Sequence, residues 1–172
     1  NDLFNINLAV TDLSNLNLHG KDLSGTILSG ADLTNTILTE ADLTGADLAY
    51  VDLSEHDLTT TNLSDSILFR TNLSGIDLRL TTLTNADFRY AILSESKLLD
   101  SQLVDNNFDF ALLKNIDFAG KDLSKSSFKQ VDLEGSDMQN SKLANAAFLQ
   151  VDFTKIKNKS LAGADLSHAS FA

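Results

Sequence analysis

The chain has 172 residues, enough for one domain with a sizeable core and too few for two. It contains no cysteine, which excludes disulfides, thiolate metal sites and cysteine nucleophiles. Its net charge of −11, from 24 acidic and 13 basic residues, argues against direct binding to nucleic acid or to an anionic membrane. No apolar run is longer than four residues, so we expect no membrane span.

An apolar residue recurs at every fifth position from Leu3 to Phe153. We call these positions centres, and the 31 of them hold 24 Leu, six Phe and one Met. The residue two before the centre is Ala, Ser, Thr or Val in 22 repeats, and the residue just before it is Asp or Asn in 20, as in Ala31, Asp32 and Leu33. The chain is therefore built from one repeating unit.

A period of five fits neither an α-helix nor a straight strand. Five helical steps of about 100° distribute the centres all round the cylinder, and an odd step in a strand puts successive centres on opposite faces. The period is satisfied if the chain turns a corner in every repeat, with the centre and the residue two before it pointing inward. Gly25 and Asn35, each two after a centre, are residues that suit tight turns. We therefore expect an all-β solenoid around a narrow core of Leu and Phe.

Four of the six central Phe lie twenty residues apart, at positions 88, 108, 128 and 148. Such a column is expected if four repeats close one square coil, because like residues then stack from coil to coil. The repeats resemble those of the pentapeptide repeat family, which read roughly Ala, Asp or Asn, Leu and two variable residues. This match runs without interruption over residues 1–153. The resemblance implies a right-handed quadrilateral β-helix with four five-residue repeats per coil, here about eight coils in a rod about 40 Å long.

The register breaks once, because the centre after Phe153 is Leu161, eight residues later instead of five. Segment 154–160 carries three Lys, and we expect it to be a three-residue insertion that bulges from a corner. With this break, residues 1–172 form a single β-helix domain. The pattern is already running at Asn1 and stops in mid-repeat at Ala172 without polar caps, so we expect a fragment of a longer chain.

Catalysis has little support in the sequence. The run from Ser54 to Asp57 contains suitable residue types, but His56 occupies an inward position and strand alternation separates it from its neighbours. Inward Lys21 and Lys121 are expected to lay their stems along the core. We predict no enzymatic activity, no metal site and no cofactor.

One corner of the predicted coil gathers aromatic and arginine side chains, the residue types that anchor protein interfaces. The candidate partner-binding residues are Tyr50, Phe69, Arg70, Arg89, Tyr90 and Phe110. Alternatively, these side chains stack between coils and only stabilise the solenoid. The first prediction for function is a non-enzymatic protein-interaction or scaffold module with an unidentified protein partner. The resemblance to the pentapeptide repeat family implies the repeat domain of a bacterial protein, either cytoplasmic or secreted as an effector into a host cell.

The second prediction follows from charge, since residues 1–86 carry a net charge of −9 and residues 87–172 only −2. Acidic members of the resembled family mimic DNA, bind DNA gyrase or topoisomerase IV and give quinolone or toxin resistance. The candidate DNA-mimicking acids are Asp12, Asp32, Asp52 and Asp57. The Leu-rich centres, the basic insertion and the lack of a dimerisation helix after Phe153 depart from those members.

Overall fold

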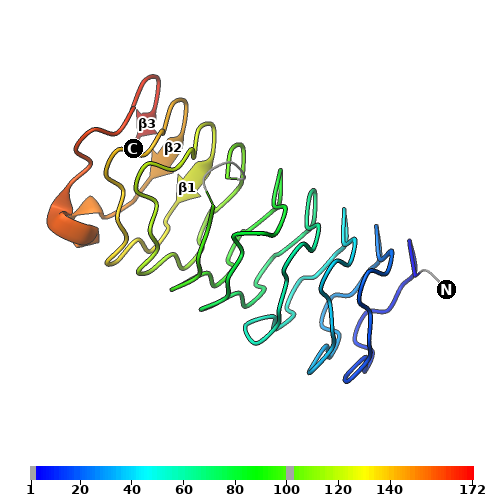
Figure 1. Ribbon diagram of the computed structural model, residues 1–172. Helices are drawn as coiled ribbons and strands as arrows, with labels where there is room; N and C mark the ends of the chain where they lie inside the picture. The colour runs from blue at the N-terminus through cyan, green and yellow to red at the C-terminus, as the bar shows by residue number, and fades with distance from the viewer. Residues whose placement is uncertain (1–2, 100–102) are drawn as a thin grey trace.

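The chain winds into a rod of stacked coils in a computed structural model that describes residues 3–99 and 103–172 (Figure 1). Residues twenty apart pair in parallel, from Asn7 with Ile27 to Asp122 with Lys142. Most of these pairs are isolated bridges, because each face of a coil is only a few residues long. Regular strands form near the C-terminal end: β1 (Ser127–Lys129), β2 (Ala147–Leu149) and β3 (Ser170–Phe171), which are neighbours in that order.

The centres fill the interior of the rod, as their apolar character predicts. Leu23 and Leu63 are completely buried, and burial of such a side chain stabilises the fold by about 1.5–3 kcal/mol. The Phe column at positions 88, 108, 128 and 148 is a stack with ring centroids 5.0–5.3 Å apart and planes within 13° of parallel. Phe171 continues the stack at 5.3 Å from Phe148. The twenty-residue spacing of this column therefore marks one coil.

Most of the described repeats end in a β-turn that forms the corner. The Leu13 carbonyl accepts the N–H of Leu16 at 3.3 Å, and the third residue of this turn, Asn15, has a φ of 61°. A positive φ at this position is the geometry of a type II turn, which glycine and asparagine adopt at least cost. The preference for Gly and Asn two residues after the centre therefore has a backbone cause.

Where Asp or Asn precedes a centre, its side chain closes the same corner from the outside. Oδ1 of Asp32 accepts the N–H of Thr34 at 2.9 Å, and Oδ1 of Asn62 accepts that of Ser64 at 3.1 Å. These are local side-chain-to-backbone bonds of the Asx type. Hydrogen bonds from the side chain and the backbone of Thr34 lower the pKa of Asp32 below its ordinary value of 3.8.

Inward hydroxyl groups join successive coils. The Thr61 hydroxyl donates to the Leu38 carbonyl at 2.9 Å, and Thr71 donates to Leu48 at 2.8 Å, in each case 23 residues earlier. Imidazole Nε2 of His56 makes the same kind of bond to the Leu33 carbonyl, at 2.8 Å. Because a carbonyl only accepts, Nε2 carries the proton.

The polar ring of His56 lies between two coils instead of pointing into the core. Ile116, at the equivalent inward position three coils later, is 1% exposed and packs among the apolar centres. An imidazole with two polar nitrogens is costly to bury there, so its ring turns toward the preceding coil. The outcome is that residues 32–38 and 52–57 are not bridged to each other.

This interruption removes backbone hydrogen bonds that neighbouring coils make. The N–H of Leu13 donates to the Asp32 carbonyl at 2.9 Å, but Leu33 has no such bond to the next coil. Pairing resumes on both sides, where Gly30 donates to Ala49 at 2.8 Å and Glu40 donates to Thr59 at 3.2 Å. Among the described residues, five N–H groups of the gap donate to no backbone carbonyl: Leu33, Asn35, Leu38, Asp52 and Asp57.

Near the C-terminus the pairing offset changes from 20 to 23. Lys142 pairs with Asp165, and Ala147 of β2 pairs with Ser170 of β3. The chain there forms two 3-10 turns, η2 (Phe153–Lys155) and η3 (Lys157–Lys159), which protrude at the end of the rod (Figure 1). Ile156 lies between them and is 3% exposed, because it occupies the inward position of its coil.

Acidification is expected to destabilise the fold. Asp32, Asp57 and Asp77 have pKa values below the ordinary 3.8, that of Asp77 falling to about 2 beside Arg79. A carboxylate with a lower pKa in the folded state stabilises the fold above about pH 4, and this contribution is lost as the pH falls toward the folded-state pKa. The free energy of unfolding, measured by urea denaturation, should therefore decrease between about pH 5 and about pH 2.5.

The matched variants for this test are Asp32→Asn and Asp57→Asn. Each keeps an oxygen that accepts the corner N–H, as Asn62 does, but removes the titrating group. The double variant should show a flatter dependence of stability on pH. An unfolding free energy that stays constant or rises on acidification would show that relief of charge repulsion outweighs the corner bonds.

Replacing His56 should close the gap and stabilise the fold. Threonine can keep a bond to the Leu33 carbonyl at normal coil spacing, and isoleucine can point into the core as Ile116 does. Five recovered backbone bonds, each worth about 0.5–1.5 kcal/mol, less the lost ring contacts, predict a gain of roughly 1–3 kcal/mol for His56→Thr and His56→Ile. Urea denaturation measures this change.

The reciprocal variant Thr36→His introduces the ring one coil earlier and should lower the unfolding free energy. If instead His56→Thr and His56→Ile each cost more than about 1 kcal/mol, as most core substitutions do, the ring is well packed where it lies, and the interpretation that His56 holds the two coils apart is wrong.

Candidate functional site

The residues predicted to bind a partner form a continuous cluster along one corner of the rod. Tyr50 and Phe69 meet edge to face at 5.6 Å, and Phe69 meets Tyr90 in the same way at 5.3 Å. Tyr90 and Phe110 are stacked, with centroids 4.6 Å apart. The Arg70 guanidinium lies within 6 Å of three of these rings. We call Tyr50, Phe69, Arg70, Tyr90 and Phe110 the aromatic corner.

The aromatic corner remains accessible although its rings touch one another. Tyr50 is 60% exposed and Tyr90 39% exposed. Lys129 extends the cluster, with its ammonium group 5.3 Å from the Phe110 centroid. Beyond it, the side-chain amides of Gln130 and Gln150 hydrogen-bond to each other along the same corner. A line of large side chains therefore runs along several coils.

Most of the aromatic corner occupies an unfavourable backbone conformation. Tyr50, Arg70, Tyr90 and Phe110 have φ values of 57–64°, as third residues of their turns. Gly30 occupies this position one coil before Tyr50 without strain. The left-handed conformation costs a residue with a side chain about 1–2 kcal/mol, a cost that the aromatic corner shares with many other corners of the rod.

The surface beside the aromatic corner is partly apolar. Ile27 and Ile67 are 40% and 42% exposed and alternate with Asp47 along one face. Arg89 is not part of the cluster, because its guanidinium turns to the Asp87 carboxylate, with nitrogen and oxygen 2.7 Å apart. The predicted residues are thus brought together except for Arg89, whose acidic neighbour two residues earlier could have indicated this pairing.

The candidate DNA-mimicking acids do not form one regular row. Asp12 and Asp32 are paired on adjacent coils, but the expected continuation from Asp32 to Asp52 is broken by the gap at His56. Asp57 belongs to the next face. Each of the four accepts a corner N–H through Oδ1, for example Asp12 from Ser14 at 2.9 Å. Sequence reasoning missed this structural role, which the recurrent Ser or Thr two residues after Asp could have revealed.

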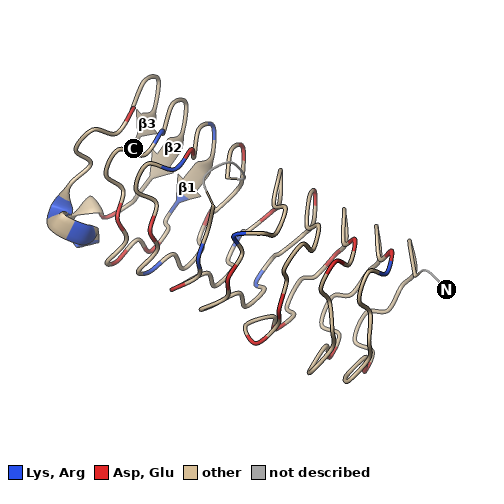
Figure 2. Ribbon diagram, viewed as in Figure 1, with Lys and Arg blue, Asp and Glu red and all other residues tan. Residues whose placement is uncertain are grey.

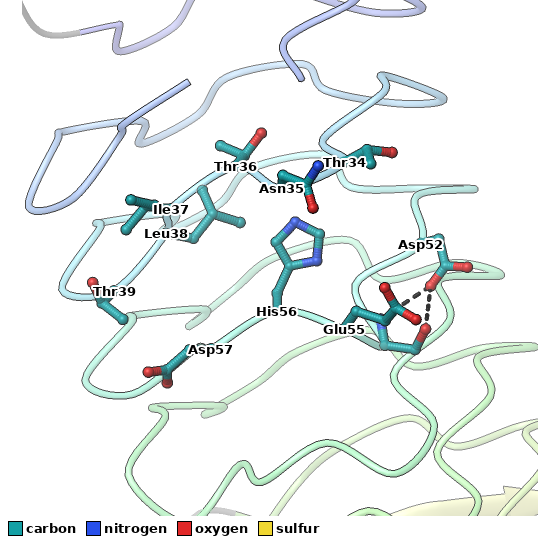
Figure 3. Close-up of a pocket in the computed structure, with 11 residues that line it drawn as sticks. Thr34, Asn35, Thr36, Ile37, Leu38, Thr39, Asp52, Glu55, His56 and Asp57 are labelled. Carbon is teal, nitrogen blue, oxygen red and sulfur yellow. Dashed lines mark hydrogen bonds between the residues drawn. The ribbon is translucent and has the colours of Figure 1, made fainter. Parts of the chain in front are cut away.

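The gap at His56 opens into a cavity of about 640 Å³ (Figure 3). One wall is the stretch from Thr34 to Thr39, and the other includes Asp52 and the segment from Ser54 to Asp57. The imidazole points from the second wall toward Asn35 and Thr36 (Figure 3). A cavity lined mainly by polar residues is therefore present where the sequence indicated only an inward histidine.

The charges are distributed unevenly along the rod (Figure 2). The lysines of η2 and η3 make a basic turn at the C-terminal end, where Lys157 pairs with Asp137 at 3.0 Å. Across residues 3–99 and 103–172, no three His, Asp or Glu side chains are grouped to hold a metal ion. The described part of the chain also has no helix that is long and apolar enough to cross a membrane.

Solved structures share this fold. HetL, a pentapeptide repeat protein involved in heterocyst differentiation regulation in the cyanobacterium Nostoc sp. strain PCC 7120, is 23% identical with a TM-score of 0.55, and the alignment covers 96% of this chain and 87% of HetL. A trypsin-treated form of QnrB1, a plasmid-mediated fluoroquinolone resistance protein, is 12% identical with a TM-score of 0.75, covering 97% and 89%. At these identities the likeness concerns the fold alone. No curated protein sequence matches the chain.

The family model for pentapeptide repeats matches most of the sequence, in segments 2–30, 26–65, 66–98 and 101–140. Its members and the structural neighbours imply a right-handed quadrilateral β-helix, which agrees with the twenty-residue pairing of the coils. The chain therefore belongs to the pentapeptide repeat family.

Proposed function

We propose that the protein is a non-enzymatic interaction module that binds a protein partner through the aromatic corner. Pentapeptide repeat proteins are generally structural or interaction modules. The rod, for which the sequence predicts about eight coils, displays its side chains at fixed spacing. A partner could therefore be bound without ordering a flexible surface, which lowers the entropic cost of association.

The observation that carries this proposal is that large aromatic side chains remain accessible at turn positions where glycine would suffice. Tyr50, Tyr90 and Phe110 stand where Gly30 shows that glycine suffices for the turn. Ring contacts return about 0.5–1.5 kcal/mol per pair, which roughly offsets the cost of the left-handed conformation. Stability alone thus gives little reason for large exposed rings here, whereas Tyr and Arg are frequent hot spots of interfaces.

Glycine substitutions separate binding from stability. In the variant Tyr50→Gly/Arg70→Gly/Tyr90→Gly/Phe110→Gly, relief of φ strain should keep the unfolding free energy within about 2 kcal/mol of the parent. Affinity for the partner should fall at least about thirtyfold, the effect of losing one hot spot. Partners recovered by affinity capture with the parent protein, and absent with the variant, are then titrated by interferometry.

The matched control is Glu40→Gly/Glu95→Gly/Lys125→Gly, which relieves the same positive φ at other corners. It should bind the partner as the parent does. A quadruple variant that folds and keeps full affinity would overturn the proposal, and one that unfolds would show that the cluster serves stability.

We keep DNA mimicry as a second candidate, with gyrase or topoisomerase IV as the partner. The paired carboxylates of Asp12 and Asp32 on adjacent coils favour it, as does the net charge of −11. The interrupted row at Asp52 and the basic turn at η3 oppose it.

A gyrase supercoiling assay, with and without a quinolone, tests the second candidate. A DNA mimic should inhibit supercoiling or protect the enzyme at low micromolar protein, and the effect should weaken with salt. The variant Asp12→Asn/Asp32→Asn/Asp52→Asn/Asp57→Asn, which keeps the corner acceptors, should lose it. An effect that survives both changes, or no effect at all, would count against mimicry.

A further inference from the structure

The cavity beside His56 is lined by backbone groups that are not used within the fold. At the equivalent positions of neighbouring coils, such groups are paired, as Asp32 N–H is with the Thr11 carbonyl at 2.9 Å. Unpaired backbone groups that a cavity exposes can bind a ligand or water. Within the described ranges, five carbonyls along the interruption lack the backbone hydrogen bond that a regular coil would supply: Ala31, Thr36, Asp52, Ser54 and Asp57.

The side chains around the cavity add further acceptors. Asp52, Glu55 and Asp57 contribute carboxylates, and no Lys or Arg is among the lining residues. Nδ1 of His56 is buried and has no hydrogen-bond partner in the described structure. In the tautomer that donates from Nε2 to the Leu33 carbonyl, Nδ1 is also an acceptor. The site therefore offers carbonyls, carboxylates and a ring nitrogen to a donor-rich cation.

The width of the gap limits what can enter. His56 spans it in a single hydrogen bond of 2.8 Å to Leu33, and the coils are paired again at Gly30 and Glu40. A whole extra strand would need two full strand spacings of about 4.8 Å between these coils. A small planar group needs much less. Anions are opposed by the carboxylates, and the described residues offer no metal-binding group of three.

We propose that this cleft binds a guanidinium group, either that of a free arginine-like molecule or that of an arginine side chain on a protein. A guanidinium is planar, always charged and has five N–H donors. It would bond to the carboxylates at the mouth and to the unpaired carbonyls inside, and charge-assisted bonds of this kind are the strong ones. Its binding would also give a function to the interruption at His56, which leaves backbone groups unpaired.

The experiment is a titration of the isotope-labelled protein followed by nuclear magnetic resonance. One arm uses free L-arginine and the other an acetyl-Gly-Arg-Gly-amide peptide, each compared with its citrulline counterpart, which has the same shape without the charge. We expect saturable shifts at the amides of Thr36, Ile37 and His56, with citrulline at least about tenfold weaker. Binding of both probes indicates a protein side chain as the natural ligand, and binding of free arginine alone indicates a small molecule.

Two variants provide the controls. His56→Thr, which should close the cleft in a folded protein, should abolish the shifts. Glu55→Gln/Asp57→Asn should weaken binding at least about tenfold while leaving the cleft open. Asp12→Asn, a carboxylate of the same kind remote from the cleft, should not change it.

The proposal is overturned if neither arginine probe gives saturable shifts, if citrulline binds equally well, or if a folded His56→Thr protein keeps the site. None of these outcomes depends on the partner of the aromatic corner, so the two proposals can fail separately.

Discussion

Coil-to-coil stacking is the interaction on which the rest of the molecule depends. A coil of twenty residues places each centre over a centre of the next coil, so the Phe column stacks at 5.0–5.3 Å while the backbone pairs in parallel. The spacing is tight enough that an inward hydroxyl such as Thr61 reaches the carbonyl of Leu38 in the coil before. A side chain that separates two neighbouring coils, as His56 does, therefore also changes the outer surface of the rod at that point.

The two candidate sites lie where the sequence departs from the repeat. At the aromatic corner, Tyr90 and Phe110 occupy a turn position that suits Gly or Asn, and the cost appears as a positive φ. At the cleft, His56 occupies a position that suits Thr or Ile, and the cost appears as unpaired backbone groups. Departures that lower stability without a compensating gain in the fold are where function is expected.

Much of the fold could be predicted from the sequence because the repeat is local and regular. The inward centres, the corner at Asn35 and the column beginning at Phe88 all follow from a period of five. Contacts between coils could not be predicted in this way, since they depend on the direction of each side chain. The turn of the His56 ring toward the preceding coil is of this kind, whereas the ion pair of Arg89 with Asp87 joins two near neighbours of the same coil.

Native-state hydrogen exchange tests the interrupted ladder most directly. The amides of Leu13 and Leu53, which donate to the next coil at 2.9 and 2.8 Å, should be protected. Those of Leu33 and Leu38 should exchange at least about tenfold faster, because they open without breaking a backbone bond. Equal protection at all four positions would contradict the gap and, with it, the cleft at His56.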